Sequence, residues 1–271
     1  MATLVPSFVA KVSRAKKHIV DLEHAITEYV GTDPYTVSEG VEGNGKNRRK
    51  VRRLTFTSDP ANTDMPILVA DSVYNLRSAL DHLQNAIVPK KRVGRVYFPI
   101  YFDGVWNPVP PEENAERLKQ RGRWLSDVKD LHVDAVAVLK ALQPADGTLP
   151  ANEVNLLSLV NRLSNTDRHK KIPVVAAGLE SFLIVWEMPD GSTGAGRGAA
   201  QDGYFIENEA EIGGVPQDAV NVQIKGSPVI VTRAGDKNWH ARIPRDLNLA
   251  VDLIEKRIIP NLSRFVRTPD G

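Results

Sequence analysis

Residues 68 to 87 constrain the fold most, because their apolar and polar side chains separate onto opposite sides at helical spacing. The apolar side comprises Leu68, Val69, Val73, Leu76, Ala79, Leu80, Leu83 and Ile87. The polar side comprises Asp71, Tyr74, Asn75, Arg77, Ser78, Asp81, His82 and Asn85. Asp, Asn, Ser and His form helices less readily than Lys and Glu, so their use indicates a role for these side chains. The alternative is an ordinary solvated face.

Other segments read as further helices and as short strands. Apolar spacing predicts helices at about 7–30, 110–125, 131–142, from 152 onwards, and at 246–266 with a bend at Pro260. Short β-type runs lie at 172–177, 181–188, 203–211, 220–225, 227–232 and 239–243, and 96–102 is an extended or irregular segment. The order predicts an α+β fold, in which an antiparallel β-meander is inserted into a helical bundle core before the C-terminal helix.

We expect one domain over residues 1–271, with a helical core formed by 1–171 and 245–267 and a β subdomain at 172–244. A chain of this length buries about three quarters of its unfolded surface, so its core needs no covalent staples. Cysteine is absent, which excludes disulfides, thiolate catalysis and Cys-ligated zinc, and agrees with a cytoplasmic location. We expect no membrane contact, and the formal net charge of +2 does not by itself indicate a polyanion partner.

A β-hairpin at about 35–57, placed in the helical core by this prediction, carries a basic arm. Its Asn44-Gly45 step is typical of hairpin turns. The basic side chains are Lys46, Arg48, Arg49, Lys50, Arg52 and Arg53. They predict an arm that binds the phosphates of RNA, and the alternative is an edge strand that charge protects from pairing.

The glycine-rich run Gly194-Ala-Gly-Arg-Gly198 has the composition of a nucleotide-binding loop. Its spacing is not G-x-G-x-x-G, and it lies between two β-type runs where that fingerprint requires a strand followed by a helix. We therefore expect a mobile hairpin loop here.

Two polar clusters have the residue types of a functional site: Arg77, Asp81 and His82, and the later run Asn165-Thr-Asp-Arg-His169. The spacing from Arg77 to His82 resembles the R-x(4-6)-H signature of HEPN proteins, helical domains that include metal-independent ribonucleases of toxin and antiphage systems. The resemblance implies that Arg77 holds a phosphate and that His82 moves protons, which leaves a 2′,3′-cyclic phosphate. The chemistry suits these residues, because histidine titrates near neutrality and arginine stays charged.

A second resemblance covers about 100 residues. Asn75-Leu-Arg-x-Ala-Leu-Asp-His82, Phe98-Pro-Ile100 and Asn165-x-Asp-Arg-His169 are similar, in this order, to the N-L-R-x-A-L-D-H, F-P-I and N-x-D-K-H motifs of a group of uncharacterised bacterial and phage proteins. Arg168 stands where that group has lysine. This resemblance implies shared architecture and a pooled polar site, and it implies no particular reaction.

Three hypotheses follow from these patterns. The first is a HEPN-like endoribonuclease that uses no metal or cofactor, binds RNA and forms a homodimer, with Arg77 and His82 catalytic. Its supporting residues are Asp71, Asn75, Asp81, Asn165, Asp167 and His169. The second is a non-catalytic binding or scaffold protein whose Arg, Asp, Asn and His side chains form a structural hydrogen-bond network. The third is a hydrolase whose Mn, Fe or Zn ligands are Asp71, Asp81, His82, Asp167 and His169.

Overall fold

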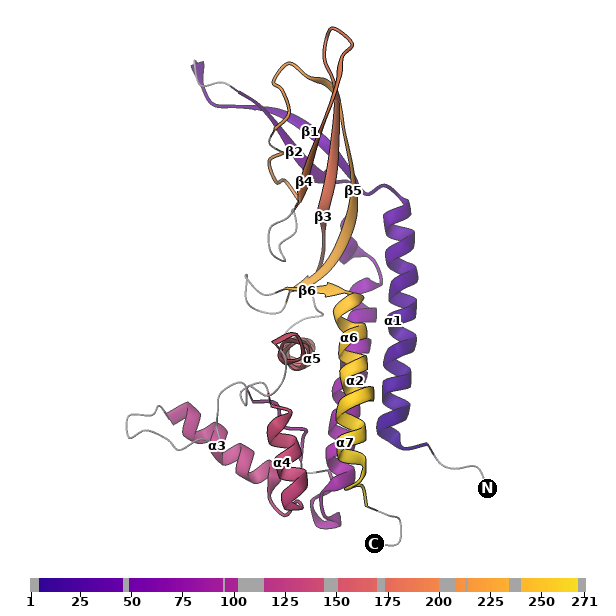
Figure 1. Ribbon diagram of the computed structural model, residues 1–271, viewed down its shortest axis with the longest axis vertical. Coiled ribbons are helices and arrows are strands. Elements are labelled where there is room, and N and C mark those ends of the chain that lie inside the picture. Colours follow the sequence, from indigo (N-terminus) through magenta and orange to yellow (C-terminus); the bar gives the residue numbers. More distant parts are fainter. Residues whose placement is uncertain are drawn as a thin grey trace. The chain divides into compact units, whose positions relative to one another are not determined.

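The computed structural model describes residues 5–45, 49–94, 96–101, 115–143, 151–169, 174–199, 208–212, 214–233 and 240–267. It confirms the α+β class, because helices and antiparallel sheets occur together (Figure 1). The chain forms two compact units. The first unit comprises Met1–Asp21, Ile67–Ile172 and Pro244–Gly271, and the second comprises Leu22–Pro66 and Pro173–Ile243.

Helices form where the apolar spacing predicts them. They are α1 (Ser7–Gly31), α2 (Met65–Ile87), α3 (Ala115–Val128), α4 (Val133–Ala141), α5 (Ala151–His169), α6 (Arg245–Leu253) and α7 (Ile259–Ser263). A π-helical turn, η5 (Ile254–Ile258), joins α6 to α7 and ends two residues before Pro260, a residue that has no N–H to continue the α-helical ladder. Within the described residues, none of the helices is both long enough and apolar enough to span a membrane.

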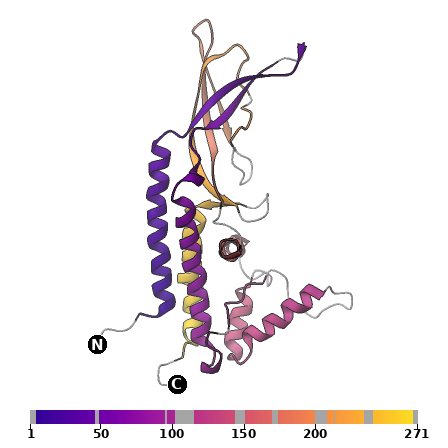
Figure 2. The same cartoon turned by 180° about the vertical axis from the view of Figure 1, so that it is seen from behind.

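The first unit is built on α2. The apolar side predicted for this helix is buried, with Leu76, Leu80 and Leu83 fully inaccessible to solvent. α1 lies beside α2 in both views (Figure 2), where His82 contacts Ser7 and the Lys11 ammonium lies 5.4 Å from the centre of the Tyr74 ring. The predicted core face of the central helix is therefore confirmed.

The second unit contains a four-stranded antiparallel sheet of order β4-β3-β5-β6. Its strands are β3 (Val174–Glu187), β4 (Thr193–Ala199), β5 (Val220–Arg233) and β6 (His240–Ile243). Two pairs of predicted runs turn out to be single long strands. The runs at 172–177 and 181–188 belong to β3, where a register shift between Leu179 and Ser181 replaces the expected break. Most of the run predicted at 203–211 lies outside the described residues.

The predicted hairpin is present as β1 (Tyr35–Glu42) and β2 (Arg49–Phe56). The two strands are antiparallel, with Tyr35 paired to Phe56. The sequence prediction grouped it with the helical core, whereas the structure groups it with the sheet. The reason is an apolar cluster, because Leu54 of the hairpin packs with Leu179 and Ile184 of β3 and with Ile212. Residues 208–212 lie along the edge of β2 that is not paired with β1, where Leu54 N donates to Ala210 O at 3.0 Å.

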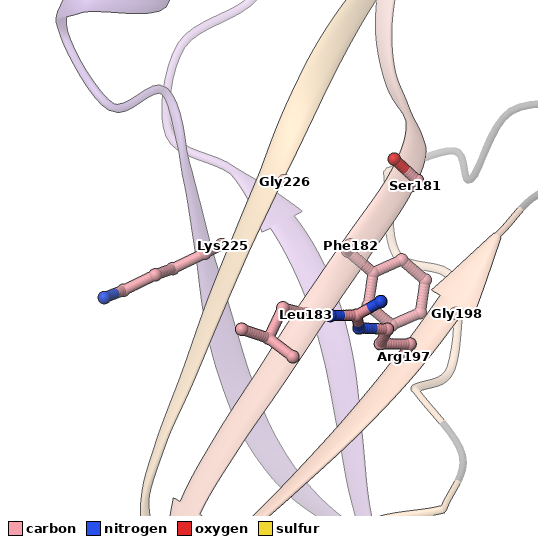
Figure 3. Close-up of a pocket in the computed structure, with 7 residues that line it drawn as sticks. All are labelled: Ser181, Phe182, Leu183, Arg197, Gly198, Lys225 and Gly226. Carbon is pink, nitrogen blue, oxygen red and sulfur yellow. The ribbon is translucent and has the colours of Figure 1, made fainter.

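The glycine-rich run is a strand and not the predicted mobile loop. β4 pairs with β3 so that Gly194 lies opposite Trp186, and Gly198 lies opposite Phe182. Figure 3 shows the Phe182 ring lying toward Gly198. The aromatic rings occupy the space that a side chain on β4 would need, so large rings on one strand and glycines on the next complement each other.

Alanine substitutions on β4 should separate the three glycines. An added Cβ would lie 2.1 Å from the Phe182 ring at Gly198 and 2.5 Å from the Trp186 ring at Gly194, but 3.4 Å from it at Gly196. We expect Gly198→Ala and Gly194→Ala each to lower the free energy of unfolding by about 1 to 3 kcal/mol, the usual cost of overpacking.

Gly196→Ala is the matched control for these two variants, because its methyl group meets ordinary van der Waals distances. It should leave stability within about 0.5 kcal/mol or raise it, since alanine restricts the unfolded chain. Urea denaturation followed by tryptophan fluorescence measures all three variants. Equal effects at the three positions would show that the rings swing away freely and that the complementarity carries no energy.

Candidate functional site

An extended segment, residues 96–101, is fixed to α2 by side chains one helical turn apart. Asn85 Nδ2 donates to Val96 O at 3.0 Å, Phe98 N donates to Asp81 Oδ1 at 2.9 Å, and Arg77 Nη2 donates to Phe98 O at 2.9 Å. Four residues of helix rise about 6 Å, and two extended residues span roughly 6.6 Å. The i,i+4 step from Asn85 to Asp81 therefore matches the alternate residues Val96 and Phe98, and Arg77 binds the remaining polar backbone group of Phe98.

Gln143 anchors the far end of the same segment. Its buried side chain donates from Nε2 to Pro99 O at 3.0 Å and accepts from Tyr101 N at 2.9 Å. Pro99 has no N–H and so disfavours a regular strand here. Side chains thus satisfy the backbone groups that a neighbouring strand would otherwise pair.

A polar pocket of about 290 Å³ lies against this segment, within the first unit. Its polar side chains are Arg77 of α2, Tyr97 and Tyr101 of the extended segment, Arg123 and Asp127 of α3, and Asn161 and Asn165 of α5. Arg77 is largely buried and forms an ion pair with Asp81 at 3.0 Å, whereas Arg123 is exposed. The pocket therefore combines guanidinium, carboxylate and amide groups from three helices with phenol groups from the extended segment.

Asp127 is the carboxylate of this pocket. Burial raises the pKa of Asp127, although the hydrogen bond from Tyr101 and the charges of Arg92, Arg77 and Arg123 oppose the shift. Tyr101 Oη donates to Asp127 Oδ2 at 2.9 Å. Burial, followed by the charge of Asp127, also raises the pKa of Tyr101, so that the phenol keeps its proton at neutral pH.

The raised pKa of Asp127 makes a testable contribution to stability. The folded state holds this proton more tightly than the unfolded state, so stability falls as the pH rises from the ordinary pKa of 3.8 through the raised value. We expect Asp127→Asn to gain stability relative to the wild type across this window and to be closest to it below about pH 4. Chemical denaturation between pH 4 and 8 measures the difference.

Tyr101→Phe should raise the pKa of Asp127 further, because it removes a hydrogen bond that favours the charged carboxylate. Its stability should fall more steeply with pH than that of the wild type. If both variants follow the wild type at every pH, the carboxylate does not titrate with folding and the assignment is wrong.

The structure brings together only part of the set of residues predicted from sequence. Arg77 and Asn165 line one pocket, and Asp81 holds Arg77 in place. His82 lies outside this lining, on the exposed surface, where its Nδ1 is 2.9 Å from Ser7 Oγ. Five residues of helix turn through about 140°, so positions 77 and 82 face different directions.

The remaining predicted residues are placed as follows. Asn75 Nδ2 donates to Asp71 O of its own helix at 2.8 Å. α5 reaches His169, but the side chains of Asp167 and His169 lie outside the described residues. Among the side chains that the structure describes, no three of His, Asp and Glu are grouped as metal ligands. Because two of the five proposed ligands are not described, the metal-dependent hydrolase stays a prediction.

The basic arm of the hairpin has internal partners where it is described. Arg52 is buried and donates to Glu39 Oε1 at 2.6 Å, Pro216 O at 2.8 Å and Ala219 O at 2.7 Å. Lys50 also binds Glu39, with a hydrogen bond that lowers the pKa of this carboxyl, and Arg53 forms an ion pair with Glu42. Lys46, Arg48 and the side chain of Arg49 lie outside the described residues.

Five polar pocket residues were missed by the sequence prediction: Tyr97, Tyr101, Arg123, Asp127 and Asn161. For Asn161 the signal was present, because it lies one turn before Asn165 on the same helix. Tyr101 follows Phe98-Pro-Ile100 directly, so it could also have been included. For Arg123 and Asp127 no local pattern distinguishes them from the other charged residues of α3, and only the tertiary fold assigns them to the pocket.

The second unit has a larger recess of about 610 Å³ on its sheet (Figure 3). Arg197 of β4 and Lys225 of β5 lie opposite Leu183 of β3 from the two sides. None of the described residues that line this recess was predicted as a site residue. The pocket that contains Arg77 and Asn165 is therefore the better candidate.

The chain matches no protein-family model, no curated protein and no solved structure. The resemblances described from sequence therefore rest on their motifs alone, and the function has to be argued from the pocket.

Proposed function

We propose that this protein is a non-catalytic binding module and that its pocket takes up a small phosphate-bearing ligand. The observation that carries the proposal is that Arg77 and Arg123, from different helices, line one recess together with Asn161 and Asn165. Arginine offers a planar fork of donors that matches phosphate oxygens, and the amide groups supply further donors. In this proposal Asp81 and Asn85 have a structural task, which is to hold the segment that forms one wall.

Arg123 is the residue whose substitution tests the ligand most directly, because it lines the pocket and its side chain is exposed. We expect Arg123→Ala to weaken the binding of ribose 5-phosphate at least about tenfold, which corresponds to one charged hydrogen bond. Arg123→Lys should lose less, since it keeps the charge but not the fork. Isothermal titration calorimetry gives these affinities.

Arg121→Ala is the matched control for the loss of a positive charge, because Arg121 lies on the same helix and does not line the pocket. It should bind ribose 5-phosphate like the wild type. If Arg121→Ala and Arg123→Ala weaken binding equally, the effect comes from net charge and no pocket is involved. If neither inorganic phosphate nor ribose 5-phosphate binds at millimolar concentration, the proposed function fails.

The metal-independent endoribonuclease of the HEPN resemblance is the second candidate. The position of Arg77 in a polar pocket favours it, while the position of His82 outside that pocket argues for the binding module. RNA cleavage in the presence of a chelator, abolished in His82→Ala, would establish the ribonuclease. The binding module predicts instead that His82→Ala keeps its ligand affinity and unfolds within about 0.5 kcal/mol of the wild type, as exposed sites usually do.

A further inference from the structure

The pocket has one wall that a phosphate does not need. Tyr97 lines the pocket and is 62% exposed, although its neighbours Val96 and Phe98 are 3% and 1% exposed. Asn85 and Arg77 donate to the carbonyl oxygens of these two neighbours and Asp81 accepts from Phe98 N, which fixes the backbone on either side of Tyr97. The tyrosine is therefore an exposed aromatic ring on a fixed backbone. A flat ligand group can stack on such a ring with little loss of conformational freedom.

The amide groups of α5 add a second requirement. Asn161 and Asn165 lie one turn apart on the same helix, and each amide is both a donor and an acceptor. A phosphate near neutrality is chiefly a hydrogen-bond acceptor, so it would offer no donor to the two amide oxygens. A planar group with donors and acceptors along its edge would satisfy them.

We propose that the ligand is a nucleotide, with its base stacked on Tyr97, the edge of the base at Asn161 and Asn165, and its phosphate at Arg123. This inference rests on the proposed function and specifies its ligand. A pocket of about 290 Å³ is at the small end of ligand sites, which suits one nucleotide. The nucleotide is either free or the terminal residue of a single strand, since both present the same chemistry.

The test compares ligands with and without a base. Calorimetric titrations of the full-length chain with ribose 5-phosphate, each of the four ribonucleoside monophosphates and a 5′-phosphorylated tetranucleotide give the affinities. We expect at least one monophosphate to bind about tenfold more tightly than ribose 5-phosphate, which is within the range for one stacked base. If the tetranucleotide binds tighter again, the natural ligand is a strand end; equal or weaker binding assigns a free nucleotide.

Variants at Tyr97 show whether the stacking ring is responsible. Tyr97→Ala should remove the tenfold preference for the nucleotide and leave the affinity for ribose 5-phosphate unchanged, while Tyr97→Phe should keep the preference. Tyr74→Ala is the control for the loss of an exposed tyrosine outside the pocket, on α2. Asn161→Ala should change the ranking of the four bases, because this amide faces the edge of the base in the proposed complex.

The possible failures can be told apart. If ribose 5-phosphate binds as tightly as every nucleotide, the base contact is wrong and the phosphate site stands. If Tyr97→Ala keeps the full preference, the base lies elsewhere and this inference is overturned. If none of the ligands binds, the proposed function itself falls.

Discussion

Asp81→Ala is expected to lower the free energy of unfolding by about 3 to 5 kcal/mol, the range for breaking a buried ion pair by removing one partner. The Asp81 carboxylate is 13% exposed and lies 3.0 Å from Arg77 Nη2, and it also accepts the N–H of Phe98 at 2.9 Å. The substitution removes the charge that neutralises a guanidinium only 10% exposed, and it takes away the acceptor of a backbone group. Urea denaturation followed by circular dichroism measures the loss.

Two further variants test the cause of that loss. Asp71→Ala removes a carboxylate from the same helix ten residues earlier and should cost less than about 1 kcal/mol, because this partly exposed side chain forms no ion pair among the described residues. Replacing both partners, Arg77→Met with Asp81→Leu, should recover much of the stability lost in Asp81→Ala, since no charge is left buried. If Asp81→Ala costs no more than Asp71→Ala, the ion pair does not hold the extended segment.

The central helix shows how far the sequence could predict the site. Its apolar side, and the selective use of Arg77, Asp81 and Asn85 on the other side, were visible as periodicity. The structure gives this choice of side chains a physical reason, because the three residues bind the backbone of residues 96–98. The motif around Arg77 and the motif Phe98-Pro-Ile100 therefore belong to two segments that contact each other in the fold.

What the sequence could not predict depends on contacts between distant segments. Periodicity places Asp127 on a helix but does not tell which segment covers it, and Tyr101 reaches it from 26 positions away. Gly194 to Gly198 reads as a loop because glycine weakens a strand, and only the pairing with Phe182 and Trp186 explains why it forms one. The sequence of the basic arm likewise does not show that Glu39 binds Lys50 and Arg52, and phosphate binding by the arm stays a prediction.

Arg52→Ala should also have a large effect and lower the free energy of unfolding by about 2 to 4 kcal/mol. The side chain is 3% exposed, and its guanidinium donates to Glu39 Oε1 and to the carbonyl oxygens of Pro216 and Ala219. Removal leaves two carbonyl groups without their donor, and each hydrogen bond to a charged group contributes about 1.5 to 3 kcal/mol, although such values do not add fully. Denaturation with guanidinium chloride gives the change in unfolding free energy.

Arg52→Lys should recover less than half of that loss, because one ammonium group cannot point at three acceptors in the directions that a planar guanidinium serves. Arg53→Ala is the matched control from the same strand, where a half-exposed ion pair with Glu42 contributes at most about 1 kcal/mol. If the hairpin instead binds RNA through Arg52, then Arg52→Ala would weaken binding while leaving unfolding unchanged. We expect the opposite result, in which Arg52→Ala lowers the free energy of unfolding and leaves RNA binding unchanged. The reason is that the buried guanidinium already uses its donors within the fold, where it joins β2 to the segment around residues 216–219.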